Sequence, residues 1–156
     1  MTNMNQDEVN KPALSYWHVW TDGEGVSHQT RVELTSFKEE SMGSGASPQW
    51  NNHILTSAAH VLFSEMPVGW IGLWHENPKP QWIIPLSGRW FVERMDGKRV
   101  EMGVGDVSFG ADQNTKSDEK GHNGHVSGTI GQQPVMLMIV QLIDDKWIGA
   151  KPGDLS

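Results

Sequence analysis

Short apolar runs recur along the chain, and polar or glycine-rich turns separate them. The runs that alternate or are continuously apolar, and that therefore predict β-strands, lie at residues 15–20, 26–37, 54–66, 70–74, 81–86, 89–95, 98–102, 105–109 and 135–142. The run 54–66 is either one long strand or two strands broken at 57–59. No window of about eleven residues or more shows the apolar period of an amphipathic helix. The pattern predicts an all-β domain, built as a sandwich or a barrel.

The turns between these runs refine the prediction. Asp96-Gly97 separates two strand candidates, and this dipeptide favours a hairpin with a type I′ turn. Pro85 lies inside the candidate at 81–86 and predicts an edge strand or a bend there. Residues 38–52 are polar and rich in glycine and serine, which predicts a loop.

Length and composition indicate one soluble domain. A length of 156 residues suggests one domain. The positions of the apolar runs predict a flexible N-terminal arm at 1–14, a β domain at 15–145 and a C-terminal tail at 146–156. A net charge of −7 argues against a nucleic-acid-binding surface. The longest apolar run, 135–140, is too short to span a membrane, and the polar start has no signal-peptide core. We therefore expect a cytoplasmic protein.

The chain has no cysteine, so its seven histidines are the main candidates for a metal site. His60 is in phase with Leu62 and is expected either in a pocket wall or in the core. His28 is expected to be structural or interfacial. His18 and His53 are expected at the surface. Eight tryptophans indicate an aromatic interior or a lined pocket.

One histidine lies in a spaced set of polar residues between Gly69 and Gly88. The segment has the form G-x5-H-x-N-x3-Q-x6-G, with His75, Asn77 and Gln81 at its polar positions. Strand side chains alternate between faces, so His75 and Asn77 should point the same way. Gln81 joins them if the intervening turn restores the phase.

The residues between these positions should face elsewhere. Trp74 and Trp82 flank the set out of phase and are expected in the core. Glu76 is the nearest acid, but it is also out of phase with His75, so it is not expected to act as a general base.

This spacing resembles the first motif of the cupin superfamily, G-x5-H-x-H-x3-E-x6-G. Asn77 stands in place of the second histidine and Gln81 in place of the glutamate. The run 103–107 (GVGDV) is similar to the turn that opens the second cupin motif, which otherwise matches poorly, with Lys116 at its histidine position. His122 or His125 would supply the late histidine.

The resemblance implies a single-domain jelly-roll β-barrel with an extra N-terminal strand segment. It also implies one divalent transition metal, Fe, Mn, Ni or Zn. The implied metal ligands are His75, Gln81 and His125, with His122 as a further candidate, and Asn77 and His60 would contact the bound molecule. His122 and His125 are three residues apart, so both could ligate only from an irregular loop. A homodimer through an edge strand in 15–37 is the implied assembly.

Three functions follow from these features. The first is a mononuclear metalloenzyme acting on a small organic molecule, its reaction undetermined. The second is a non-catalytic cupin that binds a sugar or an organic acid, and the third is a structural or regulatory dimer with a relict site. The neutral Gln81 favours the last two, whereas His75 together with two late histidines favours the first.

Overall fold

The structure, a computed structural model, describes residues 11–155, and its regular elements are almost entirely β-strands. The strands are β1 (Leu14–Thr21), β2 (Ser27–Leu34), β3 (Lys38–Glu40), β4 (Gln49–Asn51), β5 (Ala59–Met66), β6 (Gln81–Ser87), β7 (Arg89–Arg94), β8 (Arg99–Gly103), β9 (Ser108–Ala111), β10 (His125–Ile130) and β11 (Val135–Leu142). One 3-10 turn, η1 (Asp145–Trp147), follows them. The all-β, jelly-roll prediction is confirmed. None of the helical structure within 11–155 is long and apolar enough to cross a membrane.

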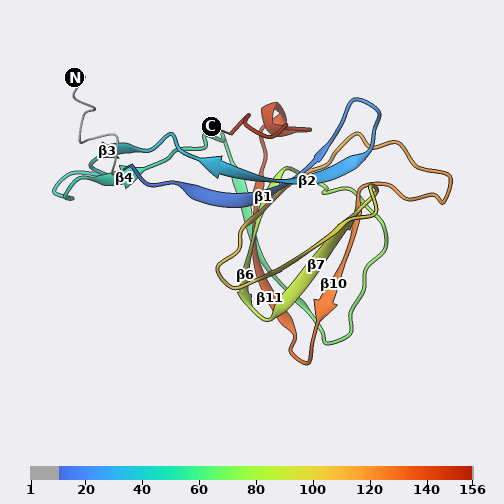
Figure 1. The fold of residues 1–156 in the computed structure, drawn as a ribbon. Helices are drawn as coiled ribbons and strands as arrows, with labels where there is room; N and C mark the ends of the chain where they lie inside the picture. Colours follow the sequence, from blue (N-terminus) through green and yellow to red (C-terminus); the bar gives the residue numbers. More distant parts are fainter. Residues whose placement is uncertain (1–10, 156) are drawn as a thin grey trace, which may run out of the picture.

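Two sheets face each other. The larger has the strand order β2-β1-β9-β6-β11-β5, and the smaller has the order β10-β7-β8. Figure 1 shows β7 and β10 opposite β6 and β11, while β1 and β2 run across their direction. No strand pairing between the two sheets is present in the described part of the chain, so they form a sandwich rather than the hydrogen-bonded barrel that was predicted.

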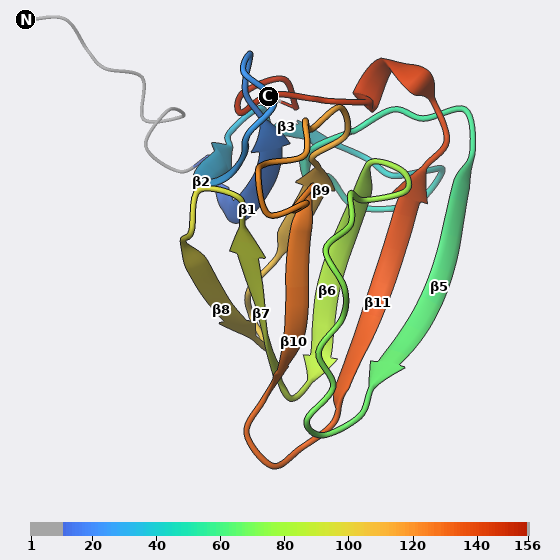
Figure 2. The same cartoon turned by 90° about the vertical axis from the view of Figure 1, so that its right-hand side faces the viewer.

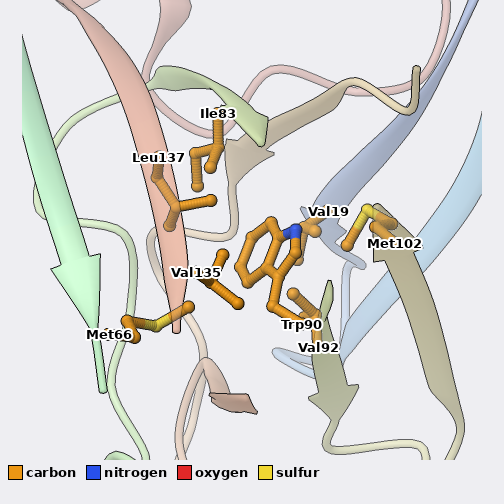
Figure 3. Close-up of a cluster of buried hydrophobic side chains, with 8 residues drawn as sticks. All are labelled: Val19, Met66, Ile83, Trp90, Val92, Met102, Val135 and Leu137. Atoms are coloured by element: carbon orange, nitrogen blue, oxygen red, sulfur yellow. The ribbon is translucent and has the colours of Figure 1, made fainter. Parts of the chain in front are cut away.

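The main core fills the space between the sheets. Trp90 of β7, which is 2% exposed, lies at its centre (Figure 3). Apolar side chains from both sheets surround the indole: Val19, Met66, Ile83, Val92, Met102, Val135 and Leu137. Because these residues alternate with outward-facing ones along their strands, burial of one face fixes the register of each strand.

A second apolar cluster covers the opposite face of the larger sheet. Tyr16 and Phe109 are fully buried there, and the segment after β11 supplies Ala150 and Leu155. Residues 146–155, predicted as a tail, therefore pack against the domain. Of the predicted arm, residues 1–10 lie outside the described part, and β1 begins at Leu14.

Some predicted elements differ from the structure. The run 70–74 is not a strand; isolated bridges at Ile71 and His75, and a hydrogen bond from the Thr129 hydroxyl to the carbonyl of Trp70, tie this region to β10. The predicted loop 38–52 contains the small β3–β4 hairpin, and β10 was not predicted because its sequence (HVSGTI) is short and only partly apolar.

Two turn predictions are also corrected. β6 lies inside the sheet, between β9 and β11, rather than at its edge. Pro85 is tolerated in this strand because β9 pairs with β6 only as far as Ile83 and leaves Pro85 without a partner on that side. The register with β11 shifts beside Pro85. At the β7–β8 hairpin Gly97 has φ 79°, but Asn114 is the only described non-glycine residue with positive φ, so the turn is not type I′.

Candidate ligand-binding cavity

A cavity of about 390 Å³ lies between the sheets, next to the main core. Its lining comprises Ser64, Glu65, Met66, Trp70, His75, Asn77, Gln81, Ile83, Trp90, His125, Ser127, Leu137 and Ile139. Four of the residues singled out from the sequence therefore share one cavity, and apolar side chains of β6 and β11 form much of the remaining wall. A concave site with a few convergent polar groups on an apolar background is typical of small-molecule sites.

A backbone bridge brings the two histidines of the cavity together. The N–H of His75 donates to the carbonyl of His125, and the N–H of His125 donates to the carbonyl of His75, both at 2.9 Å. Residues directly opposite in an antiparallel pair project to the same side. The imidazole centroids are consequently only 4.7 Å apart. His125 is 5% exposed, whereas His75 is solvent-exposed.

Each imidazole is held through its Nδ1 atom. His75 Nδ1 lies 2.7 Å from the carbonyl oxygen of Leu73, and His125 Nδ1 lies 2.6 Å from Oδ2 of Asp112. A carbonyl and a carboxylate only accept hydrogen bonds, so Nδ1 is the donor in both rings. In a neutral imidazole, Nε2 then keeps its lone pair. Neither Nε2 has a hydrogen-bond partner within residues 11–155.

Asp112 is the buried anion of the site. Its Oδ1 accepts the backbone N–H and the Nδ2–H of Asn77, at 2.8 and 2.7 Å. Burial by itself raises the pKa of the Asp112 carboxyl, but the adjacent His125 and the hydrogen bonds from Asn77 outweigh burial and hold this pKa below its usual value. Asp112 is therefore a carboxylate at neutral pH, and the fully buried charge is compensated on both oxygens.

Side-chain amides extend this arrangement away from Asp112. Gln81 Nε2 donates to Oδ1 of Asn77 at 2.8 Å, and Gln141 Nε2 donates to Oε1 of Gln81 at 3.0 Å. His60 Nδ1 lies 3.3 Å from Oε1 of Gln141 at the outer end. Every donor in this amide chain points toward Asp112, so the carboxylate sets the orientation of each amide.

The side-chain oxygens of Asn77 and Gln81, the residues assigned from the sequence to a bound molecule and to a metal, already accept hydrogen bonds within the amide chain. Asn77 Oδ1 accepts from Gln81, and Gln81 Oε1 accepts from Gln141. Asn77 cannot reverse its amide, because its Nδ2 donates to Asp112. Gly110 of β9 makes room for this side chain, since a Cβ there would lie 2.3 Å from Asn77 Nδ2.

The other two candidates lie elsewhere. His122 stacks on Trp74 with a centroid distance of 4.1 Å and lines a separate cavity of about 480 Å³, together with Arg94 and Asp118. His60 is exposed on β5 and does not line the 390 Å³ cavity. The structure thus brings together His75 and His125 beside Gln81 and Asn77, but not His122 or His60.

Histidines outside the cavity correct part of the sequence analysis. His18, predicted at the surface, is fully buried, and its Nε2 donates to the carbonyl of Ala150 at 2.8 Å. His53 is exposed, as predicted. His28 joins two turns through Asp22 and Asp96, at 2.7 and 3.2 Å, which agrees with a structural role.

The tryptophans that flank the motif also differ from each other. Trp82 packs against Tyr16 and Phe109 in the second apolar cluster, as expected for a core residue. Trp74 instead lines the cavity of His122 and is only half-buried. Glu76 accepts hydrogen bonds from the backbone and hydroxyl of Thr115, so it holds a loop, and it does not line the 390 Å³ cavity.

Two residues of the site were missed from the sequence. Asp112 was not singled out from the sequence, and Gln141 was predicted only as part of the strand at 135–142. A carboxylate directly after the buried strand β9 was the available signal for Asp112, because a buried acid needs compensating donors. Within residues 11–155 no three His, Asp or Glu side chains are grouped as a metal site.

Comparisons with known proteins add little about function. No protein-family model matches the chain, and no curated protein matches it. An ethanolamine utilization protein Q from Salmonella typhimurium LT2 superposes with a TM-score of 0.40 at 14% identity, over 84% of this chain and 97% of that one. The Cnp3 cupin domain of Schizosaccharomyces pombe superposes with a TM-score of 0.41 at 15% identity, over 95% and 99% of the two chains. At these scores, neither likeness carries an inference about activity or ligand.

Proposed function

We propose that the 390 Å³ cavity binds a small organic molecule through the imidazoles of His75 and His125. One observation carries the proposal: both rings face the same cavity with Nδ1 already bonded, which leaves two adjacent Nε2 atoms for a bound molecule. Pre-positioned polar groups of this kind reduce the ordering cost of binding.

The cavity lining suggests the class of ligand. Two neutral Nε2 atoms accept hydrogen bonds, so they fit a hydroxyl group of a sugar or of a hydroxy acid. A carboxylate only accepts hydrogen bonds, so it would have to bring the proton that it shares with one Nε2 atom. Ile83, Leu137 and Ile139 offer an apolar surface to the rest of the molecule.

Conservative variants test this proposal. In His75→Asn and His125→Asn the amide can replace the Nδ1 donor, toward Leu73 and Asp112 respectively, but Nε2 is lost. Thermal unfolding is measured with a panel of monosaccharides and of carboxylic and hydroxy acids of increasing length. We expect at least one compound to raise the melting temperature of the native protein and of the control His53→Asn. The same compound should not raise the melting temperature of His75→Asn or His125→Asn. Equal stabilisation of all four proteins, or stabilisation of none, would contradict the proposal.

A mononuclear metal site is the second candidate function. One observation favours it: histidine ligands of metals commonly donate their other ring N–H to a carboxylate or a backbone carbonyl, as His125 and His75 do here. These two imidazoles fit such an ion as an incomplete set, and water or the substrate would have to supply the remaining positions. A bound divalent ion would act there as a Lewis acid toward the substrate.

Calorimetric titration with Zn²⁺ and Ni²⁺ separates the two candidates. A metal site predicts one ion per chain in the native protein and none in His75→Asn or His125→Asn. His122→Asn should bind the ion normally, because His122 lies in the other cavity. Absence of binding to the native protein, or loss of it only in His122→Asn, would exclude this metal site.

A further inference from the structure

Strand β5 leaves an unusual edge on the larger sheet. It pairs only with β11, and no described strand lies on its other side (Figure 2). Val61 is 48% exposed and Phe63 is 63% exposed on this strand. Edge strands of monomeric proteins are usually protected by lysine, proline, a bulge or a covering segment. The sequence of β5, AHVLFSEM, contains no lysine or proline, and its pairing with β11 is regular.

The opposite edge of the same sheet is different. β2 carries Arg31 and Glu33 at exposed positions, so it has the charged side chains that discourage strand addition. The sequence analysis placed a dimer edge within 15–37, which contains this strand. β5 is the less charged of the two edges, because His60 and Glu65 are the only ionisable residues of this strand.

The free backbone groups of β5 can be identified. The N–H of Ile143 donates to the carbonyl of Ala58, which continues the β5–β11 ladder by one position. Consecutive residues of a strand direct their backbone groups to opposite sides. His60, Leu62 and Ser64 therefore bond to β11. The groups that point outward, away from the sheet, belong to Ala59, Val61, Phe63 and Glu65.

A second copy of the same strand satisfies all of these groups in one register. A two-fold axis at Leu62 places Val61 of one copy opposite Phe63 of the other, and Ala59 opposite Glu65. Centring the axis on a neighbouring residue would leave some outward groups unpaired. The Leu62 register also opposes no like charges, and it joins the two most exposed apolar side chains of the strand.

We propose that β5 is a homodimer interface, where antiparallel pairing with a second copy joins two six-stranded sheets into one. The pairing also affects the cavity, because Ser64 and Met66 of β5 line it. His60 of one copy would lie opposite Ser64 of the other, beside the cavity wall. The inference rests on the sheet edge and does not depend on which molecule the cavity binds.

A disulfide across the proposed axis tests the register. The chain has no cysteine, so Leu62→Cys introduces a single thiol. Leu62 would face its own copy as a non-hydrogen-bonded pair, with Cα atoms about 4.5 Å apart, a separation that a disulfide spans. Under mild oxidation we expect Leu62→Cys to become a covalent dimer. The controls are Phe63→Cys, displaced from its own copy along the strand, and Arg31→Cys on β2, and both should remain largely uncrosslinked.

Light scattering of the native protein provides the second measurement. We expect the native protein to have the mass of a dimer. Phe63→Lys should have the mass of a monomer, because the lysine would place a charge in the interface. The circular dichroism spectrum of this variant should match that of the native protein. A native monomer at every concentration would overturn the proposal. A Phe63→Lys protein that remains dimeric, or equal crosslinking of Leu62→Cys and Arg31→Cys, would also overturn it.

Discussion

His125 and His18 are both buried, but His125 lies beside a carboxylate and a cavity, whereas His18 lies among aromatic side chains. His18 packs between Tyr16 and Phe109, donates to a backbone carbonyl and lines neither of the two cavities described above. His125 donates to a buried carboxylate and faces the 390 Å³ cavity with its other nitrogen. Burial of an imidazole alone therefore indicates little, and His125 differs from His18 by the carboxylate and the cavity beside it.

The difference is also electrostatic. Burial lowers the pKa of His18 to about 4, so this ring stays neutral at physiological pH. The carboxylate that accepts from His125, Asp112, has its pKa held below the usual value. The region around His18 thus excludes charge from the interior, whereas the region around His125 keeps the compensated negative charge of Asp112 next to the cavity.

The largest effect is expected from removal of this charge. Asp112→Ala leaves the donors of His125 and Asn77 without an acceptor in the protein interior. A buried donor without an acceptor costs about 1–3 kcal/mol, so three such donors together should cost at least about 3 kcal/mol of unfolding free energy. Urea denaturation measures this loss, and the exposed carboxylate variant Glu119→Ala serves as the control. A loss below about 1 kcal/mol would show that Asp112 does not organise the site.

Titration of His18 should produce the next largest effect. The unfolded chain takes up a proton near pH 6.5, but folded His18 does so only near pH 4. Stability contributed by neutral His18 is therefore complete above pH 6.5, and about 3 kcal/mol is lost as the pH falls from 6.5 to 4. Urea denaturation across this range should show the slope, and His18→Gln should flatten it. An equal slope in the variant would contradict the assignment.

Gln81→Glu should have a smaller effect, in the direction opposite to that expected of a metal ligand. The new carboxylate would face Oδ1 of Asn77, which cannot turn away because its Nδ2 is bonded to Asp112. We expect a loss of about 1–3 kcal/mol in unfolding free energy and no gain in Zn²⁺ affinity. The control is Gln133→Glu, at an exposed loop position. Tighter Zn²⁺ binding with an unchanged melting temperature would instead make residue 81 a metal ligand.

The smallest effect is expected at His122. Its ring stacks on Trp74 in the neighbouring cavity and is partly exposed. His122→Ala should therefore change the unfolding free energy by about 1 kcal/mol or less, and it should not alter binding in the 390 Å³ cavity. Calorimetric titration with whichever panel compound stabilises the native protein checks the second point. A lost binding enthalpy would place His122 in the ligand site.

Local patterns predicted much of the fold and four of the six residues of the site. Alternation predicted β1, β2, β7, β8 and β11, and the spacing of His75, Asn77 and Gln81 predicted side chains that converge on one cavity. The burial of His18 could not be predicted, because its hydrogen-bond partner Ala150 comes from the far end of the chain. The role of Gln81 depends on Gln141, sixty residues away, so its free oxygen could not be judged from the motif.

The most direct test of the central claim is the position of the imidazole protons. The account requires that His75 and His125 carry hydrogen on Nδ1 and keep Nε2 free for a ligand, whereas His18 carries hydrogen on Nε2. Long-range nitrogen–proton NMR correlation of the three rings, recorded above neutral pH, distinguishes these tautomers directly. We predict Nδ1–H for His75 and His125 and Nε2–H for His18. A neutral His125 with its proton on Nε2 would contradict the account, because the Asp112 contact and the free nitrogen would both be lost.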